Sequence, residues 1–164
     1  MICFVVLSHF IERIYGSARV FAVLALAPFG GNFIGALADD ICSVVCGISP
    51  LVYGLMGAYV ITIGILLLNP DVHPITPKEL VMPTLVSLLE LVHTTSLAES
   101  SHVTNFCALI AGAGVLMFYL PSFLREEWQL MAPLVGALAI LVLFVIMPIV
   151  YHVRLGDPTC MLSQ

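Results

Sequence analysis

Ser49 and His102 are the two residues whose types and positions could form a nucleophile and its base. Ser49 stands where a polar loop passes into about twenty apolar residues, and His102 stands at a similar boundary two apolar segments later. A serine hydroxyl is a weak nucleophile until a base takes its proton, and neutral imidazole is the usual base near pH 7. Both residues would begin helices, where the positive end of the dipole disfavours imidazolium and favours an oxyanion beside Ser49. The pair predicts hydrolysis by a serine–histidine dyad.

Tyr53 would support the same site. It follows Ser49 by one helical turn on the same face, where its ring could pack on an imidazole and fix its orientation. No acidic residue near either Ser49 or His102 offers an obvious third member. Spacing alone leaves a structural interpretation open, because serine is a common helix N-cap and a histidine at a membrane boundary can bond to water.

The composition excludes an ordinary soluble domain. The 164 residues are 61% hydrophobic and 9% charged, with a mean hydropathy of +1.14, whereas soluble domains are roughly 45–50% apolar and about 25% charged. The net charge of -5 is spread over loops without a basic stripe, so nucleic acid is not an expected partner. The five cysteines lack the spacing of a disulfide framework, and Cys42 with Cys46 is only a weak pair. The sequence predicts an integral, multi-pass membrane protein.

Five apolar segments approach the length of about twenty residues that crosses a bilayer. They are 20–38, 49–68, 80–97, 102–120 and 129–151. A sixth stretch, 2–11, is too short to span, and neither a basic flank nor a cleavage site marks it as a signal peptide. We expect it to be the end of a helix whose start lies before Met1.

Basic residues predict the orientation in the membrane. With alternating spans, most of them collect on one side, which the positive-inside rule makes the cytoplasmic or equivalent side. They are Arg13, Arg19, Lys78 and Arg125. The helices that begin at Ser49 and His102 then both start at the outer face.

Small residues predict that these two helices touch. Glycine and alanine three or four residues apart let two helix backbones approach closely in lipid. The first helix carries Gly54, Gly57, Ala58 and Gly64, and the second carries Ala108, Ala111 and Gly112. Glycine is common in any transmembrane helix, so Gly64 is equally well explained without a contact.

Two Glu-x-x-His spacings, Glu90 to His93 and Glu99 to His102, have the form of the ligand pairs in di-iron helix bundles. They lie close together in the chain, and the glutamates expected from two further helices are absent. We therefore predict no metal site and no cofactor. The polar run from His93 to Ser96 is expected to be accessible to water.

Four motifs follow one another over roughly residues 8–120. They are Phe10-Ile11-Glu12-Arg13-Ile14-Tyr15-Gly16, Phe29-Gly30-Gly31-Asn32, Gly47-Ile48-Ser49 followed by Tyr53 and Gly57, and Ser101-His102-Val103. In this order and spacing they resemble the rhomboid family of intramembrane serine proteases. The Ser, Tyr and His set is the most specific part of the resemblance.

The resemblance implies an all-α fold, a polytopic transmembrane helix bundle of the rhomboid type. It also implies that Ser49 attacks a peptide bond of a transmembrane substrate while His102 serves as base. Gly47 would permit a tight approach to the serine, and the Tyr53 ring would lie beside the histidine. The expected function is an intramembrane serine endopeptidase that cleaves transmembrane segments of membrane proteins, with those substrates and the lipid bilayer as partners.

Residues 1–121 are expected to form a rhomboid-like core that lacks its first helix and part of its second. Residues 122–164 would add a connecting loop, a further C-terminal transmembrane helix and a short tail. Two departures bear on activity: the family's His-x-x-x-Asn motif, which helps to bind the oxyanion, would fall before Met1, and Pro50 replaces a glycine and removes a backbone donor. They favour the alternative, a catalytically inactive rhomboid-like protein that binds transmembrane clients. A transporter fits less well, because paired intramembrane charges and inverted repeats are absent from the sequence.

Overall fold

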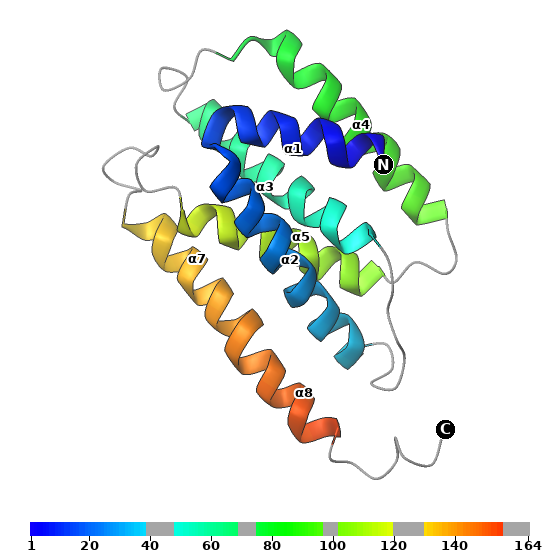
Figure 1. Cartoon of the computed structure of the whole chain (residues 1–164), viewed down its shortest axis with the longest axis vertical. Coiled ribbons are helices and arrows are strands. Elements are labelled where there is room, and N and C mark those ends of the chain that lie inside the picture. The colour runs from blue at the N-terminus through cyan, green and yellow to red at the C-terminus, as the bar shows by residue number, and fades with distance from the viewer. Residues whose placement is uncertain (39–47, 69–74, 97–101, 120–129, 156–164) are drawn as a thin grey trace.

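The computed structural model describes residues 1–38, 48–68, 75–96, 102–119 and 130–155, and every regular element among them is a helix (Figure 1). In chain order the elements are α1 (Ile2–Tyr15), α2 (Ser17–Ala38), α3 (Ser49–Leu68), α4 (Pro77–Ser96), α5 (His102–Phe118), α7 (Met131–Leu141), the π-helix η2 (Val142–Ile146) and α8 (Met147–Leu155). The predicted all-α fold is confirmed.

Helix α5 lies at the centre of the bundle. It packs against α2, α3 and α7, while α1 packs against α3 and α4. Helix α4 and the continuous rod formed by α7, η2 and α8 therefore make the two flanks (Figure 1). The largest fully buried side chains are Leu7, Ile11, Val23, Val52, Leu55, Thr62, Thr104, Val115 and Leu116. They come from α1, α2, α3 and α5, so the core lies between these four helices.

Gly16 separates α1 from α2. It has φ of +84°, a conformation that a residue with a Cβ rarely adopts, and its N–H donates to the Glu12 carbonyl at 2.8 Å. The apolar stretch predicted over 2–11 is therefore part of a helix that continues through Glu12 and Arg13. The turn of the Glu-Arg-x-x-Gly motif occurs only at its glycine.

Pro148 explains the irregular turn in the last rod. A proline inside a helix has no N–H to donate, and its ring clashes with the carbonyl four residues earlier, here that of Phe144. The π-helical turn Val142–Ile146, directly before Met147, accommodates this defect. Leu143 in this turn is buried and packs against Gly30 of α2.

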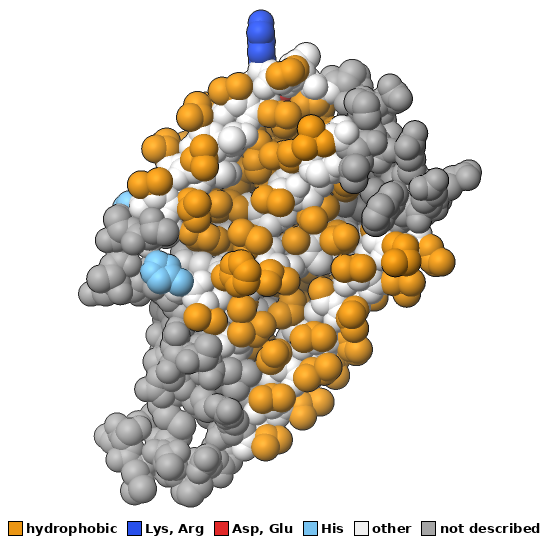
Figure 2. All heavy atoms as spheres, turned by 180° about the vertical axis from the view of Figure 1, so that it is seen from behind, with side chains coloured by type: hydrophobic (Ala, Val, Ile, Leu, Met, Phe, Trp, Pro, Cys, Tyr) orange, Lys and Arg blue, Asp and Glu red, His pale blue; other side chains and the backbone are white. Residues whose placement is uncertain are grey.

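Three of the described helices are long and apolar enough to cross a membrane, over Ser17–Ile34, Ser49–Leu67 and Met131–Val150. They correspond to three of the five predicted spans. The other two predicted spans are helices as well, but α5 has 17 residues and α4 carries too many polar residues to qualify by composition. Figure 2 shows hydrophobic side chains across most of the described surface on its face, and only 11% of the Met131–Val150 window is buried. Such an apolar exterior fits an integral membrane protein.

Candidate active site

Ser49 is the first residue of α3 and is half-buried. The Ile48 carbonyl accepts the first bonds of the helix, from the N–H groups of Leu51 at 3.1 Å and Val52 at 3.2 Å. Ile48 therefore takes the N-cap position, and Ser49 is the first helical residue rather than the cap. Among the described residues the Ser49 hydroxyl makes no capping bond. The alternative interpretation, that this serine serves only as a helix N-cap, therefore loses its main support.

Pro50 limits the backbone donors beside Ser49. Its ring is buried in the first turn of α3, and it has no N–H. The N–H groups of Leu51 and Val52 already donate to the Ile48 carbonyl. In the first turn, residues 49–52, the backbone N–H that can donate to an oxyanion is therefore that of Ser49. This arrangement supplies one donor where acyl-transfer sites generally use more.

His102 is the first residue of α5 and is exposed. The turn that follows it is fixed against α2: Thr104 and Asn105 are 1% and 3% exposed. A Cβ on Gly31 of α2 would lie 2.8 Å from the Thr104 carbonyl oxygen and 2.7 Å from the Ala108 Cβ. The glycine of the Gly-Gly-Asn motif thus lets the start of α5 lie directly on α2, which positions the histidine.

Helices α3 and α5 approach each other at the backbone. A Cβ on Gly57 would lie 1.9 Å from the Leu109 carbonyl oxygen, and a Cβ on Gly112 would lie 2.0 Å from the Gly54 carbonyl oxygen. The predicted contact between these helices is confirmed. A Cβ on Gly64 would meet nothing within 4 Å, so this glycine is not part of the contact.

The N-terminal ends of α3 and α5 lie at the same end of the bundle, on the right in Figure 1. The sequence predicted this placement from the number of crossings between Ser49 and His102. No hydrogen bond joins their side chains among the described residues, and catalytic hydrogen bonds are often long before substrate binds. Gly47, the predicted glycine beside the serine, lies outside the described residues.

Tyr53 lies one turn below Ser49 and is buried, and its hydroxyl forms a hydrogen bond with the Thr94 hydroxyl of α4. The single Thr94 proton is directed to the Glu90 carbonyl at 2.9 Å. The Tyr53 hydroxyl is therefore the donor in the bond to Thr94. This bond fixes the far end of the Tyr53 ring to α4; its predicted packing on His102 stays a prediction.

Thr94 is a residue that the sequence analysis placed wrongly. The run from His93 to Ser96 was expected to be accessible to water, yet Thr94 is 4% exposed. Tyr53 could have indicated the burial of Thr94, because a buried tyrosine hydroxyl usually needs a hydrogen-bond partner.

Of the predicted Glu-x-x-His pairs, Glu99 lies outside the described residues. Within the described part of the chain, no three His, Cys, Asp or Glu side chains gather as metal ligands.

Comparison with protein families gives one match, in which the model of the Rhomboid domain covers residues 1–122. The chain belongs to the rhomboid family. No curated protein and no solved structure gave a significant match. Membership agrees with the apolar helical bundle and with the resemblance found in the motifs. The family contains intramembrane serine proteases and inactive relatives.

Within this rhomboid, the matched region ends just beyond α5, and α7, η2 and α8 follow it. The two helices that carry Ser49 and His102 are therefore both inside the rhomboid domain. So are Gly31, Gly57 and Gly112, which bring α2, α3 and α5 together.

Proposed function

We propose that this rhomboid is an intramembrane serine endopeptidase that cleaves transmembrane segments of membrane proteins, with Ser49 as nucleophile and His102 as base. The observation that carries the proposal is the placement of these residues. Each is the first residue of its helix, the two helices begin at the same end of the bundle, and their backbones meet at Gly57 and Gly112 (Figure 1). Among the residues that the structure describes, the Ser49 hydroxyl makes no capping bond, which supports its use in chemistry.

In the proposed reaction, the His102 imidazole takes the Ser49 proton as the serine oxygen attacks the carbonyl carbon of the scissile bond. The Ser49 N–H faces the oxyanion of the tetrahedral intermediate, and the positive end of the α3 dipole favours the same charge. The imidazolium then protonates the leaving amine as the C–N bond breaks. His102 then takes a proton from a water, whose oxygen attacks the acyl carbon. The ester bond to Ser49 breaks, the His102 imidazolium returns the proton to the serine oxygen, and the carboxylic acid product leaves.

The other site residues would position this pair. Tyr53 would support the histidine with its ring while its hydroxyl is held by Thr94. Gly47, for which the family has the same residue, would permit the approach of substrate to Ser49. The bilayer surrounds the site and the transmembrane substrate is the partner.

A second candidate function is the binding of transmembrane clients without cleavage. It is favoured by the first turn of α3, where Pro50 has no N–H and the next two N–H groups donate to Ile48. Loss of one oxyanion donor typically costs about 2.7–4 kcal/mol of transition-state stabilisation. A rhomboid that depended on the Ser49 donor alone would bind a client far better than it cleaved one.

Cleavage of a transmembrane reporter by the full-length protein in proteoliposomes tests the proposal. Wild-type protein should release a soluble fragment, and Ser49→Ala and His102→Ala should not. Ser8→Ala and His9→Ala are matched controls on α1, where the Ser8 hydroxyl bonds to the Phe4 carbonyl of its own helix and His9 is exposed. Both controls should cleave. Equal release by wild type and Ser49→Ala would refute the proposal, whereas reporter co-purification without cleavage, unchanged by Ser49→Ala, would support client binding.

A further inference from the structure

Two buried tyrosines of α3 each form a hydrogen bond with a threonine of α4. The Tyr53 hydroxyl bonds to the Thr94 hydroxyl. The Tyr59 hydroxyl bonds to the Thr84 hydroxyl at 2.7 Å. Each threonine also donates to a carbonyl one turn earlier in α4, at 2.9 Å for Thr94 and 2.7 Å for Thr84. The two pairs therefore have the same chemistry at two levels of the bundle.

The first pair involves the face of α3 that meets α5. Ser49, Tyr53 and Gly57 follow one another at intervals of four residues, which places them on one face of the helix. Gly57 on this face touches the α5 backbone, because a Cβ there would lie 1.9 Å from the Leu109 carbonyl oxygen. The Tyr53 side chain therefore leaves α3 on the side where α5 lies.

Ser49 and His102 lie at one level along this contact. Helices α3 and α5 begin at the same end of the bundle and run in the same direction (Figure 1). Gly57 and Leu109, which meet, are separated along the chain by nearly as many positions as Ser49 and His102. Both helices rise by the same amount per residue. The register at Gly57 therefore brings the starts of the two helices to the same height.

The Tyr53 side chain is directed back toward this height. In an α-helix the Cα–Cβ bond tilts toward the N-terminus, so a long side chain covers the turn before its own Cα. For Tyr53 this is the turn that begins at Ser49. The ring therefore extends from α3, near the level of His102, to Thr94 of α4. Thr94 determines where the far end of the ring lies.

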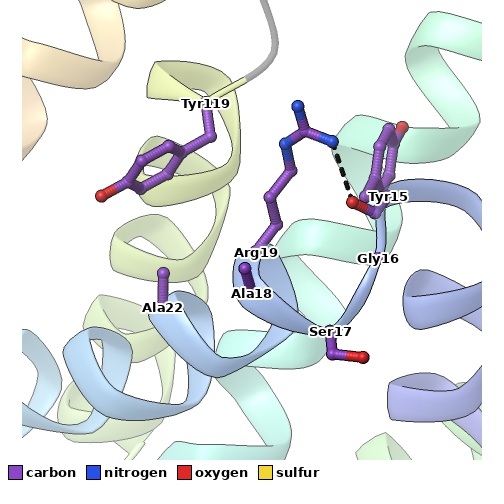
Figure 3. A pocket seen from close by; sticks show the side chains of 7 residues that line it. All are labelled: Tyr15, Gly16, Ser17, Ala18, Arg19, Ala22 and Tyr119. Carbon is purple, nitrogen blue, oxygen red and sulfur yellow. Dashed lines mark hydrogen bonds between the residues drawn. The ribbon is translucent and has the colours of Figure 1, made fainter.

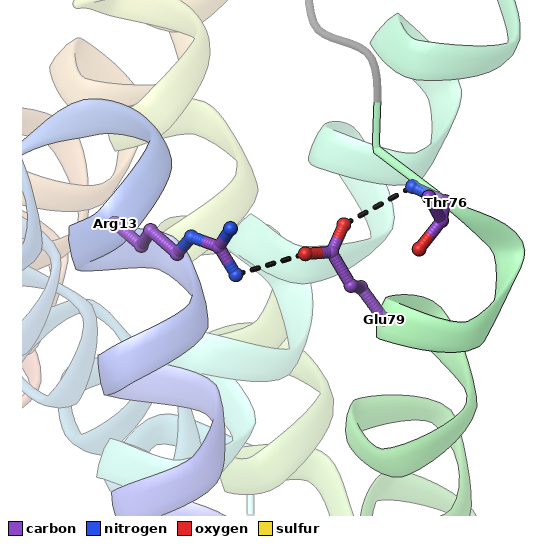
Figure 4. A network of polar contacts seen from close by, with 3 residues as sticks. All are labelled: Arg13, Thr76 and Glu79. Atoms are coloured by element: carbon purple, nitrogen blue, oxygen red, sulfur yellow. Dashed lines mark hydrogen bonds and ion pairs between the residues drawn. The ribbon is translucent and has the colours of Figure 1, made fainter.

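Helix α4 is itself held against the bundle at its first turn. Arg19 of α2 donates to the Tyr15 carbonyl at the end of α1, at 2.8 Å, which ties α1 to α2 (Figure 3). Glu79 of α4 pairs with Arg13 of α1 at 3.0 Å and accepts a bond from the Thr76 N–H at 3.1 Å (Figure 4). These contacts add to the packing of α4 on α1. A hydroxyl on α4 can therefore support a side chain of α3.

We propose that Thr94 is a positioning residue for His102 and that it acts through Tyr53. Its hydroxyl holds the far end of the Tyr53 ring, so that the face of the ring lies against the imidazole and keeps the imidazole directed at Ser49. The inference rests on the proposed function, in which His102 is the base. It extends the candidate site from α3 and α5 to α4.

The first measurement is NMR of the His102 imidazole in the full-length protein in detergent micelles, with isotope-labelled histidine. His102→Gln identifies the signal, and the exposed His9 of α1 serves as an internal reference. The face of an aromatic ring shields the nuclei that lie against it. Thr94→Val leaves the Tyr53 hydroxyl without its acceptor, so the His102 signal should move downfield. Thr94→Ser keeps a hydroxyl and should leave the signal in place.

Thr84→Val is the matched control, because it breaks the same kind of bond, from Tyr59 to α4, away from the start of α3. Cleavage of the transmembrane reporter is compared at a temperature where both valine variants are folded. Thr94→Val should be slower than the wild type by on the order of tenfold to a hundredfold, since a displacement of about 1 Å between reacting groups can cost about a hundredfold. Thr84→Val should keep the wild-type rate and the wild-type His102 signal. Equal changes in the two variants would overturn the inference.

Tyr53→Phe keeps the result decisive if Thr94→Val does not fold. It removes the same bond from the other side, and Thr94 keeps its bond to the Glu90 carbonyl. The His102 signal should again move downfield, and an unchanged signal would overturn the inference. Absence of cleavage by the wild type would refute the proposed function, and the NMR signals would still decide whether Thr94 positions His102.

Discussion

Gly57→Ala tests the backbone contact that brings the two halves of the candidate site together. The new methyl group would lie 1.9 Å from the Leu109 carbonyl oxygen and 2.8 Å from the Leu109 carbonyl carbon. Real contacts of this kind are essentially never below 3.0 Å, so α3 and α5 must separate by about 1 Å at this level. Both neighbours are backbone atoms, which cannot move aside as a flexible side chain can.

Gly64→Ala is the matched control, because Gly64 lies on the same helix and a Cβ there meets nothing within 4 Å. Both substitutions gain the helix propensity of alanine over glycine, about 1 kcal/mol. Only Gly57→Ala adds the strain of overpacking, typically about 1–3 kcal/mol. We therefore expect Gly57→Ala to be less stable than Gly64→Ala by about 1–3 kcal/mol, a difference of several degrees in Tm.

The assay is thermal unfolding in detergent followed by circular dichroism, with reporter cleavage measured on the same samples. A displacement of about 1 Å between catalytic groups can cost about a hundredfold in rate. Gly57→Ala should thus lose most of its cleavage even at temperatures where it is folded, and Gly64→Ala should keep it. Equal stability and equal cleavage in the two variants would refute the close approach of α3 and α5.

Three further outcomes follow from named contacts. Thr94→Val should destabilise the fold by about 1–3 kcal/mol in thermal unfolding, because it leaves the buried Tyr53 hydroxyl without its acceptor. Thr94→Ser keeps a hydroxyl and should retain most of the wild-type stability. Equal stability of the two variants would count against the bond. The hydrogen bond from the Thr76 N–H, followed by the pair with Arg13, lowers the pKa of Glu79 from its usual value of 4.5, so these two contacts stabilise the fold above about pH 4.5 and are lost as the pH falls further. The unfolding midpoints of Glu79→Gln should lack this pH-dependent component, and an acid profile like that of the wild type would contradict it. Gly31→Ala should lower Tm in the same unfolding assay, because its methyl group would lie 2.8 Å from the Thr104 carbonyl oxygen, and a Tm at or above that of the wild type would argue against the packing of α5 on α2.

The starts of the two site helices were predictable because polar loops give way there to long apolar runs. The predicted segments 49–68 and 102–120 begin at the same residues as α3 and α5. Helix α4 begins earlier than predicted, at Pro77, a residue whose missing N–H suits the first turn and which Glu79 follows. Composition locates the apolar part of a helix well, but it does not locate a polar first turn that precedes the apolar part.

The contacts between helices were less predictable because they depend on how each helix is rotated about its axis. The small residues indicated that α3 and α5 touch, but not that Gly57 would meet a carbonyl group and Gly64 open space. The bond from Tyr53 to Thr94 joins residues 41 positions apart, and no local pattern specifies it. The roles of Ser49 and His102 rest on the resemblance and on the shared end of the bundle, and they remain proposals.

Covalent labelling of Ser49 tests the proposed mechanism most directly. A fluorophosphonate reacts with a serine whose hydroxyl is activated by a base, whether or not a good peptide substrate is known. Full-length protein in liposomes should become labelled at Ser49, identified by mass spectrometry, and His102→Ala should lose the labelling while Ser8→Ala keeps it. An unlabelled Ser49 in folded protein, under conditions where an active rhomboid protease reacts, would contradict the account.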